Sequence, residues 1–78
     1  MGTSIEFVLP VLNEERVLNT NTNILKDYLD HNLSDYRWSI LIADNGSSDA
    51  TSEIARSLAD GDKRIRYLRL EKRGRGRA

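Results

Sequence analysis

Residues 38–51 (WSILIADNGSSDAT) decide the fold, because they join a strand, a turn and the start of a helix. The first six are rich in β-forming side chains, and no charge precedes Asp44 in this stretch. A strand without charge on either face is typical of a covered parallel sheet. Residues 45–48 predict a turn, and Ser48 or Asp49 is the expected cap of the following helix.

The remaining elements lie on either side of this unit. Before it we predict a strand at residues 5–9, which ends before Pro10, and a helix from about Glu14 to Leu29. After it we predict a helix that stops at Gly61 and a strand at residues 65–70. The second helix should bury Ala50, Ile54, Ala55 and Leu58. Trp38 and Tyr67 alternate with aliphatic residues and are expected in the core. The order β-α-β-α-β with right-handed crossovers predicts a short parallel sheet with helices packed on it, which is half of a doubly wound α/β fold.

The composition is that of one small globular domain without a uniform charge. Its 78 residues contain 12 Lys and Arg and 12 Asp and Glu, which argues against a dedicated nucleic-acid-binding protein. Cysteine is absent, so no disulfide or thiolate metal site is expected, which fits a reducing compartment. Residues 1–4 show no secretory signal, and no apolar run approaches the roughly 20 residues of a membrane span. We therefore expect a soluble, cytoplasmic chain.

Polar and charged loops follow the carboxyl ends of the predicted strands, where parallel α/β sheets bind ligands. The first loop lacks the Gly-x-Gly-x-x-Gly dinucleotide fingerprint, and a Gly-Lys-Ser phosphate loop is also absent. Carboxylates at strand ends accept hydrogen bonds from a base edge or from ribose hydroxyls, and Asp44 and Glu14 are placed for this. The alternative is that Asp44 and Asp49 only satisfy turn and cap amides.

Two motifs, in this order, resemble the opening of family 2 glycosyltransferases, most of all the dolichyl-phosphate mannose and glucose synthases. They are residues 8–15 (VLPVLNEE) and residues 40–51 (ILIADNGSSDAT). That family has a Pro-x-Tyr-Asn-Glu loop after its first strand and an Asp-Asp-Gly-Ser-x-Asp-x-Thr turn after its second. Residues 74–78 (GRGRA) are a third match. The resemblance covers nearly the whole chain and implies a three-layer α/β/α, Rossmann-like half-fold of the GT-A type.

The resemblance also implies a nucleoside pocket. Its residues would be Pro10, Leu12, Glu14, Ile42, Asp44 and Asn45. Asp44 would hydrogen-bond the base, and Ile42 would lie beside it in the floor. The sequence departs from the family pattern twice. Leu12 replaces an aromatic residue, so stacking becomes apolar contact, and Asn45 replaces a second Asp, which removes one negative charge.

The basic residues 71–78 follow the nucleotide-binding half at residues 1–70 and have two interpretations. In the first, they begin the next helix, and Arg73 and Arg75 contact the diphosphate, as guanidinium groups readily do. In the second, they are a solvated charged end. A nucleic-acid-binding tail would need interleaved aromatic residues for stacking, and this segment has none.

The catalytic machinery is expected outside this chain, so no catalytic and no metal-binding residue is assigned within it. In the family, an Asp-x-Asp motif holds Mg²⁺ or Mn²⁺ against the sugar diphosphate after a fourth strand, and the catalytic base follows later. The complete enzyme would transfer a hexose with inversion from a nucleotide-diphosphate sugar to an acceptor such as a polyprenyl phosphate. This chain alone would be inactive.

Other functions and partners are also considered. The alternative function is a non-catalytic nucleotide-binding or protein-interaction module that reuses the half-fold. An unpaired sheet edge invites pairing with another chain, so a homodimer is expected. Contact with a membrane lipid is expected only through sequence outside this chain.

Overall fold

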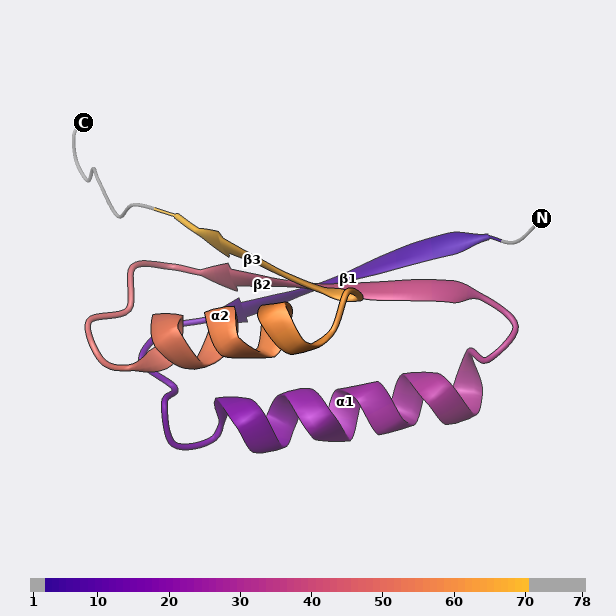
Figure 1. The fold of residues 1–78 in the computed structure, drawn as a ribbon, viewed down its shortest axis with the longest axis horizontal. Coiled ribbons are helices and arrows are strands. Elements are labelled where there is room, and N and C mark those ends of the chain that lie inside the picture. The colour runs from indigo at the N-terminus through magenta and orange to yellow at the C-terminus, as the bar shows by residue number, and fades with distance from the viewer. Residues whose placement is uncertain (1–2, 71–78) are drawn as a thin grey trace.

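The computed structural model describes residues 3–70, which form one parallel sheet and two helices (Figure 1). The elements are β1 (Ser4–Val11), α1 (Leu18–Asn32), β2 (Arg37–Asp44), α2 (Thr51–Gly61) and β3 (Ile65–Arg69). The strands lie in the order β1-β2-β3, and both pairs are parallel. The predicted β-α-β-α-β half-fold of the α/β class is therefore confirmed.

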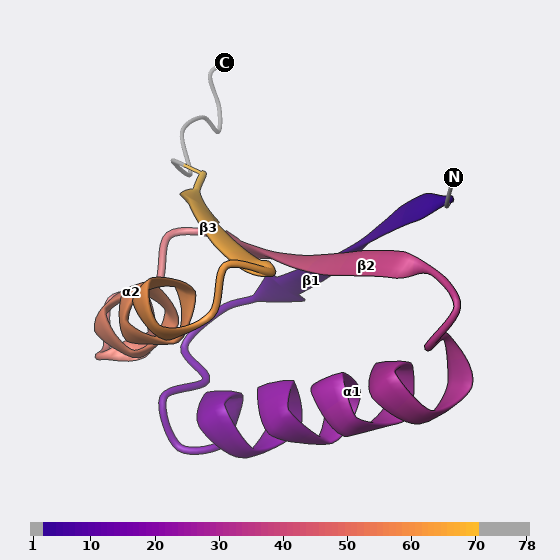
Figure 2. The ribbon, with the colours of Figure 1, turned by 45° about the vertical axis from the view of Figure 1, so that its right-hand side comes forward.

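Both helices cover the same face of the sheet, as Figures 1 and 2 show from two directions. Two right-handed crossovers that step in the same direction place their helices on the same side. Residues 3–70 thus supply the sheet and one helical layer of the three-layer class. The opposite face carries apolar side chains that no described element covers, such as Val8, which is 60% exposed, and Leu68, which is 47% exposed.

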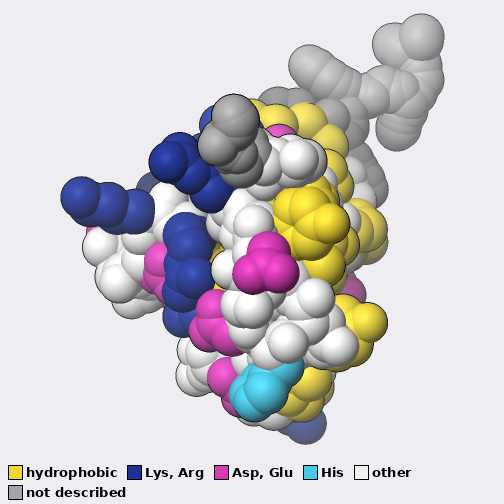
Figure 3. Space-filling view, turned by 90° about the vertical axis from the view of Figure 1, so that its right-hand side faces the viewer, with side chains coloured by type: hydrophobic (Ala, Val, Ile, Leu, Met, Phe, Trp, Pro, Cys, Tyr) yellow, Lys and Arg dark blue, Asp and Glu magenta, His cyan; other side chains and the backbone are white. Residues whose placement is uncertain are grey.

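The core lies between the sheet and the two helices. Its buried side chains are Val11, Leu18, Leu29, Trp38, Ile40, Ile42, Ala55 and Ile65. Trp38 is therefore a core residue, as predicted, and the guanidinium of Arg64 lies 3.9 Å from the centre of its ring. At the amino ends of the strands, Figure 3 shows hydrophobic side chains gathered on one side and basic side chains on the other.

Both helices begin later than the sequence indicated. The helix expected from Glu14 starts at Leu18, because residues 14–17 form a tight turn in which the Glu14 carbonyl accepts from the Val17 amide at 3.1 Å. No acidic residue lies in its first turn, contrary to the prediction. In α2 the cap position is Ala50, although Asp49 accepts from the Thr51 amide at 2.9 Å.

Strand β1 continues through Pro10 to Val11, two residues beyond the predicted end. The carbonyls of Thr3 and Val11 accept hydrogen bonds from the amides of Arg37, the first residue of β2, and of Asn45, the residue after its end. Because main-chain groups alternate in direction along a strand, the intervening Pro10 directs its nitrogen away from β2. A proline fits this edge strand because no ladder hydrogen bond needs its missing N–H.

Candidate functional site

The carboxyl ends of all three strands meet at one end of the sheet. Val11 pairs with Asp44, and Asp44 pairs with Arg69, so the three strand ends lie at one level. The loops at residues 12–17 and 45–50 both leave from this level (Figure 1). The residues that sequence analysis placed in two separate motifs are therefore neighbours in space.

Asn13 joins these two loops. Its backbone φ is 51°, and its amide donates to Ser47 Oγ at 2.8 Å. Its side-chain Oδ1 accepts from the amide of Ser48 at 2.8 Å and from the amide of Asp49 at 3.4 Å. We call this set of bonds between residues 13–15 and residues 47–51 the loop clasp.

The acidic residues of the two motifs complete the loop clasp. The Glu15 carboxylate accepts from the Ala50 amide at 2.8 Å, and the Glu15 amide donates to Asp49 Oδ2 at 3.3 Å. The Glu14 amide donates to Thr51 Oγ1 at 2.8 Å, and this hydroxyl in turn donates to Asp49. The hydrogen bond from Thr51 lowers the pKa of Asp49. Asp49 thus satisfies turn and cap groups, which is the alternative that the sequence left open.

The loop clasp also occupies the amino end of α2. Each main-chain amide of residues 47–51 donates to a side-chain acceptor within the two loops or to Asp44. A helix amino terminus binds phosphate through such amides when they are free. In this arrangement the acceptors for these amides are already supplied by the chain, so residues 47–51 present no free main-chain amide to a phosphate.

Asp44 is the fully buried acid of the site, with 0% of its surface exposed. Its Oδ1 accepts from the Ser47 amide at 2.9 Å, and its Oδ2 accepts from the Tyr67 hydroxyl at 2.7 Å. Arg69 Nη1 lies 3.5 Å from Oδ2. Burial acts to raise the pKa of Asp44, but the hydrogen bonds from Ser47 and Tyr67, with Arg69 nearby, lower it below its ordinary value of 3.8. A buried carboxylate held in its ionised form is a strong hydrogen-bond acceptor.

The other predicted pocket residues lie in different surroundings. Leu12 is 44% exposed, and Glu14 and Asn45 are half-buried near the loop clasp. Ile42 is fully buried in the core. Pro10 is exposed on the opposite face of the sheet from Ile42, because Pro10 pairs with Ala43 in the strand register. Arg73 and Arg75 lie outside the described residues.

Sequence analysis missed Tyr67 and Arg69 as members of this site. Both lie on the helix-covered face of β3, and both reach the Asp44 carboxylate. Tyr67 was expected in the core, and its ring does pack against core residues. The alternation of Ile65, Tyr67 and Arg69 along the strand could have indicated that Tyr67 and Arg69 belong to the site. It places all three side chains on the same face of the sheet, next to the strand that carries Asp44.

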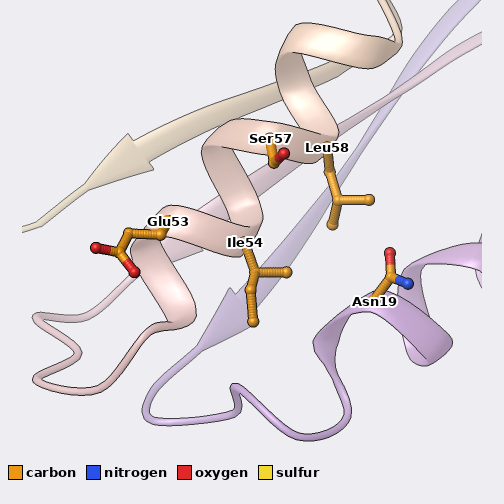
Figure 4. A pocket seen from close by; sticks show the side chains of 5 residues that line it. All are labelled: Asn19, Glu53, Ile54, Ser57 and Leu58. Carbon is orange, nitrogen blue, oxygen red and sulfur yellow. The ribbon is translucent and has the colours of Figure 1, made fainter.

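A hollow of about 520 Å³ lies between the two helices, away from the predicted pocket residues (Figure 4). It is lined by Asn19, Glu53, Ile54, Ser57 and Leu58. Ile54 and Leu58 point toward Asn19 across the hollow in this view. None of these residues was predicted to bind a ligand. Among the five lining residues, only Glu53 is charged.

No group of three or more His, Asp or Glu side chains within residues 3–70 is arranged to hold a metal ion. Glu15, Asp44 and Asp49, the acids nearest the strand ends, instead accept hydrogen bonds from amides and hydroxyls. In the same part of the chain, neither helix has the length and apolar character needed to cross a bilayer.

A parallel sheet with a buried acid and two hydrogen-bonded loops at its carboxyl end is an α/β arrangement in which ligands bind beyond the strand ends. The family model described as glycosyl transferase family 2 matches residues 6–78, and the chain belongs to this family.

Two characterised relatives are similar to it over most of its length. The glycosyltransferase AglD of Haloferax volcanii is 35% identical over 78 residues, which cover 99% of the chain and 12% of that protein. The succinoglycan biosynthesis protein ExoA of Rhizobium meliloti is 39% identical over 72 residues, or 92% of the chain and 21% of that protein. The chain thus spans a small part of the length of either relative.

Proposed function

We propose that this chain is the nucleotide-sugar-binding segment of an inverting glycosyltransferase. The observation that carries the proposal is Asp44, which is buried and ionised at the carboxyl end of β2 in a chain of glycosyl transferase family 2. The transferred group would be a hexose from a nucleotide-diphosphate sugar, and the acceptor a polyprenyl phosphate. Transfer would require residues outside this chain, so the chain alone would be inactive.

Within this proposal, each group has a role that its chemistry supports. Asp44 would accept a hydrogen bond from an N–H of the base through Oδ1, because Oδ2 already accepts from Tyr67 and Arg69. Leu12 would contact the nucleoside through its exposed apolar side chain, and Glu14 and Asn45 would flank it. Because the amides of residues 47–51 are occupied, the diphosphate would bind elsewhere, with Arg73 and Arg75 as the proposed contacts.

Magnesium or manganese would neutralise the leaving diphosphate in the complete enzyme. Within residues 3–70 no group of three or more His, Asp or Glu side chains is arranged to hold such an ion. We propose no metal ligand and no catalytic residue here.

Titration of the chain with uridine and guanosine diphosphates, followed by amide NMR shifts, tests the proposal. We expect shifts in residues 11–14 and 44–46 with one of these nucleotides, and weaker ones with Asp44→Asn. Asp60→Asn, which removes an exposed acid from α2, is the matched control and should leave binding unchanged. Pyrophosphate alone should not shift residues 47–51. Absence of shifts with both nucleotides would overturn the proposal.

We further propose that two copies of this chain associate through a sheet edge. Within residues 3–70, β1 and β3 each have one neighbour, so each leaves a row of main-chain groups unpaired. We also propose that the complete glycosyltransferase is cytoplasmic and meets its lipid acceptor at the cytoplasmic face of the membrane. The absence of cysteine from the sequence fits a reducing compartment.

A further inference from the structure

The hydroxyl of Tyr67, on β3, is one of the hydrogen-bond donors that hold the Asp44 carboxylate. It donates to Asp44 Oδ2 at 2.7 Å, while the Ser47 amide donates to Oδ1 at 2.9 Å. The two donors come from different elements and hold one oxygen each. A carboxylate held at both oxygens cannot rotate about its terminal bond without losing a hydrogen bond.

We propose that Tyr67 is a positioning residue of the nucleotide site, whose hydroxyl orients the Asp44 carboxylate toward the base. This inference rests on the proposed function and adds to it a residue outside the two sequence motifs. Tyr67 acts through Asp44 and does not itself contact the nucleotide.

The surroundings of Tyr67 hold its ring in place. The guanidinium of Arg56, on α2, lies 5.5 Å from the ring centre, and the ring packs against the core. Cation–π contact and packing restrict the ring, so the hydroxyl is presented to Asp44 from a fixed direction. Burial, followed by the hydrogen bond to Asp44, raises the pKa of Tyr67, so the hydroxyl keeps its proton at neutral pH.

The charged and titratable groups around Asp44 are limited in number within residues 3–70. Strand β3 contributes Tyr67 and Arg69, and α2 contributes Arg56 through its contact with the Tyr67 ring. Strand β1 contributes Val11 at the paired position, which does not titrate. Loss of the Tyr67 hydroxyl therefore removes one of the groups that keep Asp44 ionised while leaving Arg69 in place.

Tyr67→Phe tests the proposal, because it keeps the ring and removes the hydroxyl. We expect binding of the preferred nucleoside diphosphate to weaken about three- to tenfold at neutral pH, the effect of losing one intramolecular hydrogen bond of ordinary strength. Tyr36→Phe, at a 44% exposed tyrosine, is the matched control and should bind as the unmodified chain does. Equal affinity of the Tyr67→Phe variant would overturn the proposal.

A pH series separates positioning from a structural role. Protonation of Asp44 should abolish the base contact, so affinity falls at acid pH, and this fall should move to higher pH in Tyr67→Phe. The carbon resonance of the Asp44 carboxyl should show the same upward displacement without ligand. If affinity drops by the same factor at every pH and the resonance titrates unchanged, the proposal is wrong.

A double-mutant cycle closes the test. Because Tyr67 acts through Asp44, adding Tyr67→Phe to Asp44→Asn should cause no further loss of affinity. Additive losses would contradict the inference. If the unmodified chain bound neither nucleotide, the proposed function would fail as well, whereas binding that Tyr67→Phe does not alter would reject the positioning role alone.

Discussion

Asn13 combines a left-handed backbone with four hydrogen bonds to the second loop. Its φ of 51° is one that asparagine adopts more readily than other residues with a side chain. Its Oδ1 accepts from the amides of Ser48 and Asp49, and its own amide donates to Ser47. The Asn of the first motif therefore has a structural role here, since it fixes the loops that would flank the nucleoside.

Replacement of Asn13 by alanine should destabilise the chain by about 2 kcal/mol, because it strains the left-handed backbone and leaves two amides without their acceptor. Urea unfolding followed by circular dichroism measures this free energy. Asn13→Gly separates the two causes, since glycine accepts the backbone angle but lacks the acceptor. We expect its loss to be smaller than that of alanine and still measurable. An Asn13→Ala variant as stable as the unmodified chain would show that the loop clasp contributes nothing.

At the residue scale, the sequence predicted where Asp44 would lie but not which side chains would hold it. The end of an uncharged strand before a turn sets its position. Its partners Tyr67 and Arg69 are more than 20 residues away in the chain, and their contact depends on the β2–β3 register. The pattern of residues within one strand does not reveal the register between two strands. Tyr67 was therefore predicted only to be a core residue.

At the element scale, an ion pair ties α1 to the loop after α2. Lys26 Nζ lies 2.9 Å from Asp62 Oδ2, and both side chains are largely shielded from solvent. The hydrogen bond from Lys26 lowers the pKa of Asp62 from 3.8 to about 2. Asp62 also accepts from the Arg64 amide at 2.9 Å, so one carboxylate connects the first helix to the start of β3.

This pair should give the fold an acid-sensitive component. A carboxyl whose folded pKa is depressed stabilises the fold fully above its unfolded value, and the contribution is lost as pH falls through the folded value. For Asp62 the loss should occur between about pH 4 and pH 2. Asp62→Asn should lower stability at pH 7 by roughly 1–2 kcal/mol and flatten the pH dependence in that window.

Chemical unfolding at a series of pH values checks this expectation. Asp60→Asn, two residues earlier in α2 and exposed, serves as the control and should follow the unmodified chain. A stability difference for Asp62→Asn that persisted unchanged down to pH 2 would contradict the assignment to the ionised carboxyl.

The element order and types could be predicted because each segment has a clear period. Residues 38–43, in the second strand, lack charge. In the second helix, apolar residues recur every three to four positions. The start of the first helix could not be predicted in this way. Glu14 and Glu15 are typical of a first helical turn, but their amides donate to Thr51 and Asp49, and a turn closed from Val17 to Glu14 precedes the helix. Tertiary contact outweighed local preference at that position.

At the scale of the whole molecule, the open sheet governs association. We expect the mass measured by sedimentation to rise with concentration as copies pair through a sheet edge. Val8→Pro should weaken pairing at β1, because Val8, like Pro10, directs its main-chain nitrogen away from β2. Its fold should be retained, since no hydrogen bond to β2 is removed. A monomer mass at all concentrations would contradict the proposed homodimer.

Pro10 limits how far any further strand could extend the sheet beyond β1. A strand that ran alongside β1 would find donors at Ser4, Glu6 and Val8 but none at Pro10, one residue before the strand ends. Its pairing would therefore weaken toward the end where the loops gather. The added strand could turn away from β1 at Pro10 without losing a hydrogen bond. This would leave the carboxyl end of the sheet, where the two loops lie, uncovered on the β1 side.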